Sequence, residues 1–442
     1  APILGVRTTR AEAQLRQVVH PARVFQGEAS VPGDKSITHR AILFAAIATA
    51  PSHISGFLDS GVCRASIAAV ESLGITVLRE GADTLVVQGR GLDGISEPVE
   101  VVDCAGSGTT MRFLAGLLAS YDMTAVLTGN EALRRRPMGR IIEPLRAMGA
   151  TVLARGHDRF PPVIVRGSEL RGIEYTMPVA SAQIKSCLLL AGLRARGPTT
   201  VREPALTRDH SERMLSAMGE SLTRGRGTVT IEPAVALAPL DITVPGDLSS
   251  AAFLVAAGLL VPGSGLRILN VGVNPTRTGF LDIVRAMGGQ VSLDNERDVG
   301  GEQVADVWVQ QSPLRATTVG GDLVPLAIDE LPLVAVLATQ AEGVTEVRDA
   351  AELRVKESDR VATLVGELRK MGARIEELPD GYIVEGPTRL QGAMVQAHGD
   401  HRLAMALAVA ALVADCSVTI EGAEYVGESY PGFFETLAGL QQ

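Results

Sequence analysis

The sequence predicts an α/β protein with two similar domains, built from six copies of one βαβαββ-like unit. Three observations lead to this prediction. The chain has 442 residues, more than one ordinary hydrophobic core accommodates. A phrase ending in Met-Gly or Leu-Gly recurs along it at intervals of roughly seventy residues. Six apolar helical segments alternate with segments that have the periodicity of strands.

The recurring glycine phrase is typical of a helix that ends and a strand that begins directly after it. The position just past a helix often adopts a left-handed conformation, which glycine enters without steric cost. A strand-like run follows each of these glycines. We therefore expect left-handed glycines at equivalent helix ends, namely Gly74, Gly149, Gly219, Gly288 and Gly372.

Six longer helices are predicted to lie inside the domains. Each begins with polar residues that suit a helix N-terminus and then becomes apolar on nearly every face, which is typical of a fully buried helix. These segments are residues 35–48, 107–119, 181–193, 248–260, 329–341 and 400–413. Alternating apolar residues between them predict strands at residues 84–91, 161–167, 228–233, 307–311 and 381–386.

Three units are assigned to each domain. The strand before the first Pro-Gly-Asp phrase is expected to join the chain that follows the second such phrase. Domain I would then comprise residues 1–32 and 245–442, and domain II residues 33–244. The chain would pass from one domain to the other at each of these two Pro-Gly-Asp sequences, which suit hinges.

Composition and charge argue against several classes of protein. A net charge of −9 and few aromatic residues disfavour a nucleic-acid partner. Four widely spaced cysteines favour neither a disulfide framework nor a zinc site. No apolar run is long enough for a membrane span, and residues 1–15 lack an apolar signal core. We therefore expect a cytoplasmic protein without a membrane partner, and a monomer.

The starts of the six buried helices predict a site for small anions. A helix N-terminus offers free N–H groups and a partial positive charge, and equivalent starts in each unit can face one cleft. Many cationic side chains lie at or near these starts. They are Lys35, Arg40, Arg134, Arg135, Arg136, Arg140, Arg208, Lys356, Arg360 and Arg402.

Each of these signals is weak alone. The sequence before Lys35 and Ser36 lacks the glycine that a P-loop requires. Arg134 and Arg135 are equally typical of a solvated charge run, and the helical spacing of Lys356 and Arg360 also suits surface salt bridges. Several cationic starts at equivalent places in a repeated fold nevertheless favour a common anion site.

The motifs, taken in order along the chain, resemble those of the EPSP (5-enolpyruvylshikimate-3-phosphate) synthases. They are VPGDKSITHR, SGTTMR, RRPMGR, SAQIKS, TRDH, LRVKESDR and GDHRLAM, and the likeness runs from residue 22 to the C-terminus. The resemblance implies a two-domain inverse α/β barrel with its active site in an interdomain cleft that closes over the ligands. It implies transfer of the enolpyruvyl group of phosphoenolpyruvate to the 5-hydroxyl of shikimate 3-phosphate through a tetrahedral intermediate.

The same resemblance assigns the site residues. Shikimate 3-phosphate would be held by Lys35, Ser36, Arg40, Ser181, the backbone of Ala182, Gln183, Arg208, Asp329 and Lys356. Phosphoenolpyruvate would be held by Lys35, Gly108, Arg136, Gln183, Arg360 and Arg402.

Proton transfer is assigned to two carboxylates. Asp329 would take the proton of the 5-hydroxyl, and Glu357 would exchange a proton with C3 of phosphoenolpyruvate, with Lys356 as a relay and Lys35 beside them. His401 suits a proton shuttle, an orienting donor or a structural histidine. The reaction requires no cofactor and no metal, and the sequence offers no cluster of metal ligands.

Two positions depart from the pattern of the family. Ala105-Gly106 stands where many relatives carry Gly-Asn, which leaves open one hydrogen bond near the phosphoenolpyruvate pocket. Glu428 stands where some relatives carry Lys, so no cation is expected there. Gly108 retains the small residue of glyphosate-inhibited relatives, which implies that glyphosate inhibits this protein too.

Two alternatives compete with this interpretation. UDP-N-acetylglucosamine enolpyruvyl transferases share the fold and the reaction type, but they carry Lys-Asn at the first motif and a reactive Cys near the Arg-Pro phrase. Here the first motif has Lys35-Ser36, and residues 113–136 contain no Cys. A binding or scaffold protein without catalysis would be expected to lack the acid–base carboxylates, yet Asp329 and Glu357 are both present.

Overall fold

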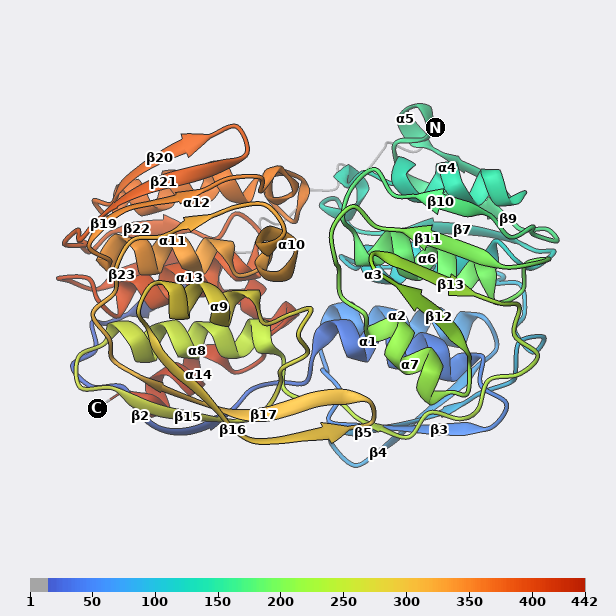
Figure 1. Cartoon of the computed structure of the whole chain (residues 1–442), viewed down its shortest axis with the longest axis horizontal. Helices are drawn as coiled ribbons and strands as arrows, with labels where there is room; N and C mark the ends of the chain where they lie inside the picture. Colours follow the sequence, from blue (N-terminus) through green and yellow to red (C-terminus); the bar gives the residue numbers. More distant parts are fainter. Residues whose placement is uncertain (1–14, 442) are drawn as a thin grey trace, which may run out of the picture.

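The computed structural model describes residues 15–441, which form two lobes side by side, each around its own hydrophobic core (Figure 1). The core of domain I draws on residues between Val19 and Ala29 and between Leu248 and Leu440. The core of domain II draws on residues between Ile37 and Val244. We propose the predicted boundaries, residues 1–32 with 245–442 and residues 33–244, and the two separate cores support them. Residues 1–15, whose sequence lacks an apolar signal core, lie almost wholly outside the described residues.

Five four-stranded sheets share one order, in which a parallel pair of strands is followed by two antiparallel neighbours. In domain II the sheets are β14 (Ile242–Thr243), β3 (Pro51–Ser55), β5 (Thr84–Gln88), β4 (Thr76–Glu80); β6 (Val102–Asp103), β7 (Thr124–Thr128), β9 (Phe160–Arg166), β8 (Thr151–Ala154); and β10 (Glu174–Thr176), β11 (Thr199–Arg202), β13 (Thr228–Ile231), β12 (Leu222–Gly225). In domain I they are β2 (Gln26–Ser30), β15 (Gly265–Gly272), β17 (Glu302–Gln310), β16 (Gln290–Val299); and β18 (Thr318–Val319), β19 (Gly343–Val347), β21 (Gly381–Gly386), β20 (Arg374–Leu378).

The sixth sheet differs from the predicted unit. It has three strands, β22 (Met394–Gln396), β23 (Val418–Glu421) and β1 (Arg16–Val19). After β23 the chain forms the 3₁₀ helix η3 (Ala423–Glu428) and helix α14 (Phe433–Leu440) in place of a second helix and a hairpin. The antiparallel partner of β23 is therefore β1, which comes from the opposite end of the chain. The predicted α/β class and repeated architecture are otherwise confirmed.

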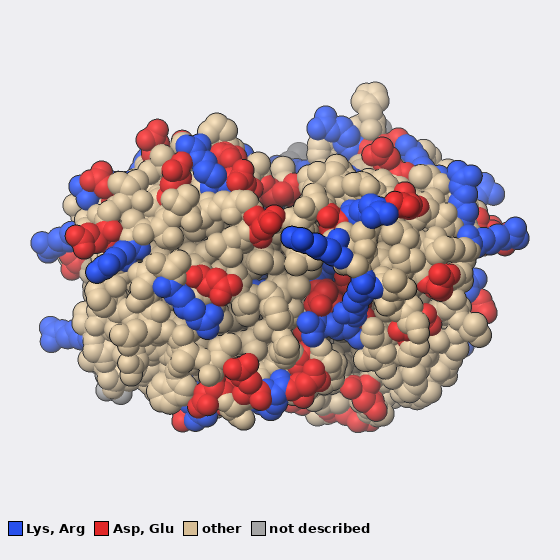
Figure 2. Space-filling view, viewed as in Figure 1, with Lys and Arg blue, Asp and Glu red and all other residues tan. Residues whose placement is uncertain are grey.

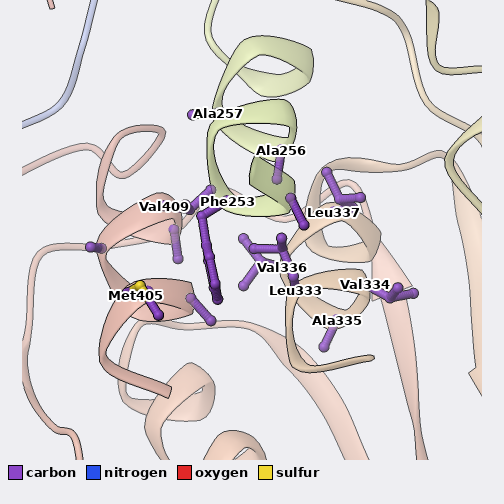
Figure 3. Close-up of a cluster of buried hydrophobic side chains, with 14 of the residues drawn as sticks. Phe253, Ala256, Ala257, Leu333, Val334, Ala335, Val336, Leu337, Met405 and Val409 are labelled. Atoms are coloured by element: carbon purple, nitrogen blue, oxygen red, sulfur yellow. The ribbon is translucent and has the colours of Figure 1, made fainter. Parts of the chain in front are cut away.

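The six predicted buried helices are present at the centres of the domains. They are α1 (Lys35–Ala46), α3 (Gly108–Leu118) and α6 (Ala182–Gly192) in domain II, and α8 (Leu248–Leu260), α11 (Leu331–Gln340) and α13 (His401–Ala411) in domain I. In domain I, side chains of α8, α11 and α13 such as Phe253, Val336 and Met405 form a continuous apolar cluster (Figure 3). Small residues allow close packing, since a Cβ on Gly116 of α3 would lie 2.2 Å from the carbonyl oxygen of Cys187 in α6.

A second set of helices covers the cores from outside. These are α2 (Gly61–Ser72), α4 (Gly139–Met148), α7 (His210–Ala217), α9 (Gly279–Ala286) and α12 (Arg360–Lys370), and the short segments are η1 (Leu133–Arg135), α5 (Arg155–Asp158), α10 (Leu323–Ala327) and η2 (Ala351–Val355). Each of the five longer helices ends one or two residues before a predicted left-handed glycine. Those glycines have φ of 84°, 118°, 95°, 87° and 84°, which confirms the prediction.

The β16–β17 hairpin links the domains beside the two hinge segments. It runs along the lower edge of the view from domain I to domain II (Figure 1). Near its tip, Glu302 lies 2.7 Å from Nδ1 of His210 on α7, and the carbonyl of Gly301 accepts a hydrogen bond from Arg213. Between residues 15 and 441, no helix has both the length and the apolar character needed to cross a membrane.

Candidate active site between the domains

A cavity of about 440 Å³ lies between the two domains. As the sequence predicts, residues at or within a few positions of the starts of all six buried helices line it. These residues are Lys35 and Ser36 of α1, Gly108 and Thr109 of α3, Ser181, Ala182 and Gln183 of α6, Asp247 of α8, Asp329 of α11 and Arg402 of α13.

The helix starts are not equivalent as anion sites. Aspartates cap α1, α8 and α13, where Asp34, Asp247 and Asp400 accept hydrogen bonds from the first turn of the helix. These carboxylates already satisfy amides that an anion would otherwise contact. At the start of α6, the side chain of Ser181 makes no such bond. The first backbone amides of α6 therefore stay available to a ligand in the cavity.

Asp329 is surrounded by four cations. Its Oδ1 lies 3.1 Å from Nη1 of Arg360, 3.4 Å from Nζ of Lys356 and 3.8 Å from Nε of Arg402. Its Oδ2 accepts a hydrogen bond from Arg208 of domain II. Burial raises the pKa of Asp329, but these four cations outweigh burial and hold the pKa well below its usual value. The carboxylate is therefore ionised.

Glu357 has a similar environment. Its Oε1 lies 3.2 Å from Arg136 of domain II, and its Oε2 accepts a 2.7 Å hydrogen bond from Arg360. Burial raises its pKa, whereas Arg360, Arg136, His401 and Lys35 lower it, and the net effect is a pKa well below the usual value.

Arg360 connects these two carboxylates to a third. Its Nη1 donates to Asp329, its Nη2 to Glu357, and its Nε to Asp400 at 2.7 Å. Burial lowers the pKa of Arg360, but the three carboxylates, Asp400 foremost, raise it above the ordinary value. The guanidinium therefore fixes the positions of Asp329 and Glu357 relative to each other.

Lys35 and Glu428 line another wall of the cavity, and the buried imidazole of His401 lies between them. Nζ of Lys35 lies 3.4 Å from Nε2 of His401, and Nδ1 of the same imidazole lies 3.4 Å from Oε2 of Glu428. Burial, followed by Lys35 and Arg402, holds the pKa of His401 well below its usual value, so the imidazole is neutral. Burial and then Arg402 lower the pKa of Lys35.

Arg112 is a buried cation that the sequence analysis did not single out, although it belongs to the SGTTMR motif. It donates to Oε1 of Gln183 and, at 3.1 Å, to the carbonyl of Pro137. Nε2 of Gln183 in turn donates to Thr109 Oγ1 at 2.8 Å. Burial, together with Arg136 and Arg140, holds the pKa of Arg112 well below its ordinary value. Arg112 thus sets the orientation of the Gln183 side chain in the cavity.

Gly108 provides space for two guanidinium groups. A Cβ at this position would lie 2.7 Å from Nη1 of Arg112 and 3.2 Å from Nη1 of Arg136. Glycine at the start of α3 therefore allows Arg136 to approach the helix N-terminus.

Most of the predicted site residues line the cavity, but Arg40 does not. Its guanidinium is buried behind the wall, where it donates to Ser211 Oγ at 2.8 Å, to Ser186 Oγ at 3.0 Å and to the carbonyl of Ser36 at 3.0 Å. This geometry supports a role in holding Ser36 rather than direct ligand contact. Oγ of Ser36 in turn lies 3.4 Å from Arg208.

The outer part of the arginine run behaves as a solvated charge cluster. Arg134 donates to the carbonyl of Gly129, and Arg135 pairs with Glu131 one turn away. Neither lines the cavity, whereas Arg136 and Arg140 do. Proline directly after Arg136 keeps its backbone extended, with ψ of 140°, and ends the η1 turn there.

Ion pairs across the cavity hold the domains close together. Arginines of domain II meet carboxylates of domain I in the pairs Arg136–Glu357, Arg208–Asp329 and Arg140–Glu352. The surface view shows Lys and Arg side chains with Asp and Glu beside them at the junction of the domains (Figure 2). Anionic ligands entering between the domains must compete with these carboxylates for the same arginines.

Several residues of this network escaped the sequence analysis. Asp400 and Asp247 follow a glycine at the start of a buried helix, which is a signal for a capping aspartate. Glu352, which pairs with Arg140, and Arg277, which lies 3.0 Å from Asp247, have no comparable local signal, because their partners belong to other segments of the chain. Residues 15–441 contain no group of three or more His, Cys, Asp or Glu side chains placed to hold a metal ion.

Comparison with known proteins agrees with this geometry. A family model described as EPSP synthase (3-phosphoshikimate 1-carboxyvinyltransferase) matches residues 19–437. A 3-phosphoshikimate 1-carboxyvinyltransferase of Citrifermentans bemidjiense is 49% identical over 96% of this chain and 99% of its own. The enzyme of that name from Geobacter sulfurreducens is 50% identical over 95% of this chain and 97% of its own. A solved EPSP synthase from Acinetobacter baumannii superposes with a TM-score of 0.86 and 39% identity, covering 97% of this chain and 98% of that one.

Proposed function

The chain belongs to the EPSP synthase family, and we propose that its interdomain cavity carries out the family's reaction, 3-phosphoshikimate 1-carboxyvinyl transfer. Members of this family are transferases of the shikimate pathway, which supplies aromatic amino acids. The enolpyruvyl group of phosphoenolpyruvate passes to the 5-hydroxyl of shikimate 3-phosphate, and phosphate leaves. One observation carries the proposal: two ionised carboxylates, Asp329 and Glu357, share Arg360 inside a cavity lined by cations of both domains.

Shikimate 3-phosphate is assigned to the side of the cavity formed by α6 and Arg208. The uncapped start of α6 and the Arg208 guanidinium suit a phosphate group, and Lys356 and Asp329 suit ring hydroxyls. The residues assigned to this substrate are Lys35, Ser36, Ser181, Ala182, Gln183, Arg208, Asp329 and Lys356, with Arg40 placed behind Ser36.

Phosphoenolpyruvate is assigned to the side formed by Gly108 and the remaining cations. A phosphate and a carboxylate on one small molecule require several donors at short range, and guanidinium groups bind both in a bidentate manner. The residues assigned here are Lys35, Gly108, Arg136, Gln183, Arg360 and Arg402.

The two carboxylates are assigned to proton transfer. Glu357 takes up a proton from solvent once substrate anions draw Arg136 away and delivers that proton to C3, while Asp329 accepts the proton of the 5-hydroxyl as that oxygen bonds to C2. The tetrahedral intermediate then returns a C3 proton to Glu357 and expels phosphate, which takes up the proton held by Asp329 through Lys356. Substrate anions that draw Arg136 and Arg208 away from the carboxylates raise the pKa of both acids towards the range in which they exchange protons.

Three further properties belong to the proposal. Glyphosate is expected to inhibit in competition with phosphoenolpyruvate, because Gly108 leaves the Arg136 side of the cavity open. A monomer is proposed because one chain supplies every residue assigned to the site. A cytoplasmic location is proposed because the four cysteines, at positions 63, 104, 187 and 416, are unpaired in the part of the chain described.

The direct test is phosphate release from phosphoenolpyruvate by the purified protein. Release that requires shikimate 3-phosphate is the expected result, with UDP-N-acetylglucosamine as the control acceptor. Release only with the sugar nucleotide would assign the protein to the UDP-N-acetylglucosamine enolpyruvyl transferases instead. Release with neither acceptor would favour a binding role. Inhibition by glyphosate that does not compete with phosphoenolpyruvate would contradict the placement of the inhibitor.

A further inference from the structure

Of the buried and half-buried acidic residues that line the cavity, Glu428 has the weakest ion pairing. It ends η3, its side chain is 30% exposed, and it lines the cavity. Other carboxylates there pair with arginine, as Asp329, Glu357 and Glu352 do. Among residues 15–441, Glu428 has no Lys or Arg nitrogen within the 4.0 Å of an ion pair, and its neighbour is the neutral imidazole of His401.

Gly106 of domain II faces Glu428 across the cleft. A Cβ on Gly106 would lie 3.9 Å from Oε1 of Glu428 and 3.2 Å from Nδ2 of Asn130. A longer side chain at 106 would therefore enter the space beside the carboxyl. With glycine at 106, no side chain fills this space, and Glu428 lines the same cavity as Lys35 and Arg136.

The charged groups around Glu428 come from several elements. Lys35 of α1 and Arg136 after η1 are cationic, whereas Glu357 before α12 and Asp400 at the start of α13 are anionic. His401 of α13 is neutral, and the residue of α2 that lines the cavity is the apolar Val62. Burial has the largest effect on the charge state of Glu428, and the nearby charges act in opposite directions.

We propose that Glu428 is a specificity-determining residue for phosphoenolpyruvate. The substrate binds well while the Glu428 side chain is a neutral acid and poorly once that side chain is a carboxylate. As a neutral acid, Glu428 can donate its O–H to the anion and places no negative charge beside it. As a carboxylate, it places a negative charge beside the phosphate or carboxylate of the substrate. This inference rests on the proposed function, since it assigns the ligand of the Arg136 side.

The expected transition falls near neutral pH. Burial raises the pKa of Glu428 to about 7, with Glu357 and Asp400 adding to the increase and Lys35 and Arg136 opposing it. The group is thus neutral below this pH and ionised above it. A bound anion raises the pKa further, so binding takes up a proton once the pH exceeds the pKa of the free protein, and the affinity for phosphoenolpyruvate falls.

The test compares wild type with Glu428→Gln, which keeps the shape and removes the titration. The KM for phosphoenolpyruvate is measured from pH 6 to 9 with saturating shikimate 3-phosphate, and the ratio of wild type to variant is taken at each pH. Because the ratio cancels the ionisation of the substrate, it isolates residue 428. We expect the ratio to rise about 15-fold between pH 7 and 8.5, since the protonated fraction of a group with a pKa of about 7 falls from about one half to about 3% over this range.

Glu424→Gln is the matched control, because Glu424 lies on the same 3₁₀ helix but outside the cavity. Its KM ratio should stay constant with pH, and its kcat should change little. Equal thermal midpoints will show that each variant is folded. A ratio for Glu428→Gln that does not change with pH overturns the inference.

Calorimetric titration with phosphoenolpyruvate alone, at pH 6.5 and 8.5, separates the inference from the proposed function. In one outcome, neither wild type nor variant shows turnover, yet wild type loses affinity for phosphoenolpyruvate at pH 8.5 and Glu428→Gln does not. The proposed function then fails and the role of Glu428 stands. If all proteins are active but their affinities change equally with pH, the role of Glu428 fails and the proposed function stands.

Discussion

The guanidinium of Arg136 in domain II lies 3.2 Å from the carboxylate of Glu357 in domain I. This pair joins a residue proposed to hold phosphoenolpyruvate to a residue proposed to exchange its C3 proton. An anion that takes Arg136 removes a positive charge from the neighbourhood of Glu357. Ligand binding and the activation of the acid are therefore coupled through one contact.

Replacement of Glu357 by Gln should abolish most of the activity without weakening substrate binding. The amide keeps the shape but carries no exchangeable acid, so kcat should fall about 10²–10⁴-fold. The KM for phosphoenolpyruvate should not rise, because Arg136 loses a competitor for the anion. Steady-state kinetics with both substrates measure these quantities.

Glu352→Gln is the control for Glu357→Gln. Glu352 also bridges the domains, at 2.9 Å from Arg140, but its side chain is 37% exposed. Loss of this bridge should change kcat little, because an exposed ion pair contributes at most about 1 kcal/mol. Equal losses of kcat in the two variants would refute the assignment of Glu357 to proton transfer.

Gly108→Ala should weaken the binding of phosphoenolpyruvate and of glyphosate while sparing shikimate 3-phosphate. The added methyl carbon meets the Arg112 guanidinium at 2.7 Å and that of Arg136 at 3.2 Å, so both side chains must move. A displaced ion contact costs on the order of 1–3 kcal/mol, which corresponds to a rise in the KM for phosphoenolpyruvate of about 5- to 150-fold. An increase confined to the KM for shikimate 3-phosphate would contradict this placement of the two substrates.

The repeated architecture was predictable from the sequence because its signals are local. A left-handed glycine and a capping polar residue act within one helical turn, so Gly149 or Gly372 marks a helix end without any knowledge of tertiary structure. The starts of six buried helices then had to occupy equivalent places. The convergence of those starts on one cavity follows from the repetition of the unit.

The pairing of charges inside the cavity was not predictable in the same way. Arg40 in α1 and Arg208 just before α7 both lie close to a helix start, yet Arg40 is turned to buried serines and Arg208 to Asp329. The sixth unit likewise departs from the repeat, because β23 finds its partner β1 at the other end of the chain. Contacts between residues hundreds of positions apart leave no periodic signal in a single sequence.

Two glycines with open surroundings offer a test of backbone conformation alone. A Cβ would meet nothing within 4 Å at either Gly219 or Gly366, but Gly219 has φ of 95° and Gly366 lies inside α12. Gly219→Ala should reduce the free energy of unfolding by about 1–2 kcal/mol, and Gly366→Ala should increase it by about 0.5–1 kcal/mol. Chemical denaturation measures both. Effects of the same sign would show that backbone conformation does not decide the outcome.

The buried pair of Arg360 and Asp400 should contribute strongly to stability. Their side chains are 2% and 0% exposed and meet at 2.7 Å, so Asp400→Ala leaves a guanidinium without its main partner inside the protein. The free energy of unfolding should fall by about 3–5 kcal/mol, as expected when one member of a buried ion pair is removed. Urea unfolding followed by circular dichroism measures this loss.

Asp359→Ala provides the matched control for Asp400→Ala, because both aspartates cap a helix and pair with an arginine. Asp359 caps α12 and lies 2.8 Å from Arg354, but its side chain is 39% exposed. Loss of the cap should cost about 1 kcal/mol, and loss of the exposed pair at most about 1 kcal/mol more. The difference between the variants therefore isolates the burial of the Arg360 pair. If both lose the same stability, Asp400 acts mainly as the cap of α13, and the position of Arg360 must depend on Asp329 and Glu357 instead.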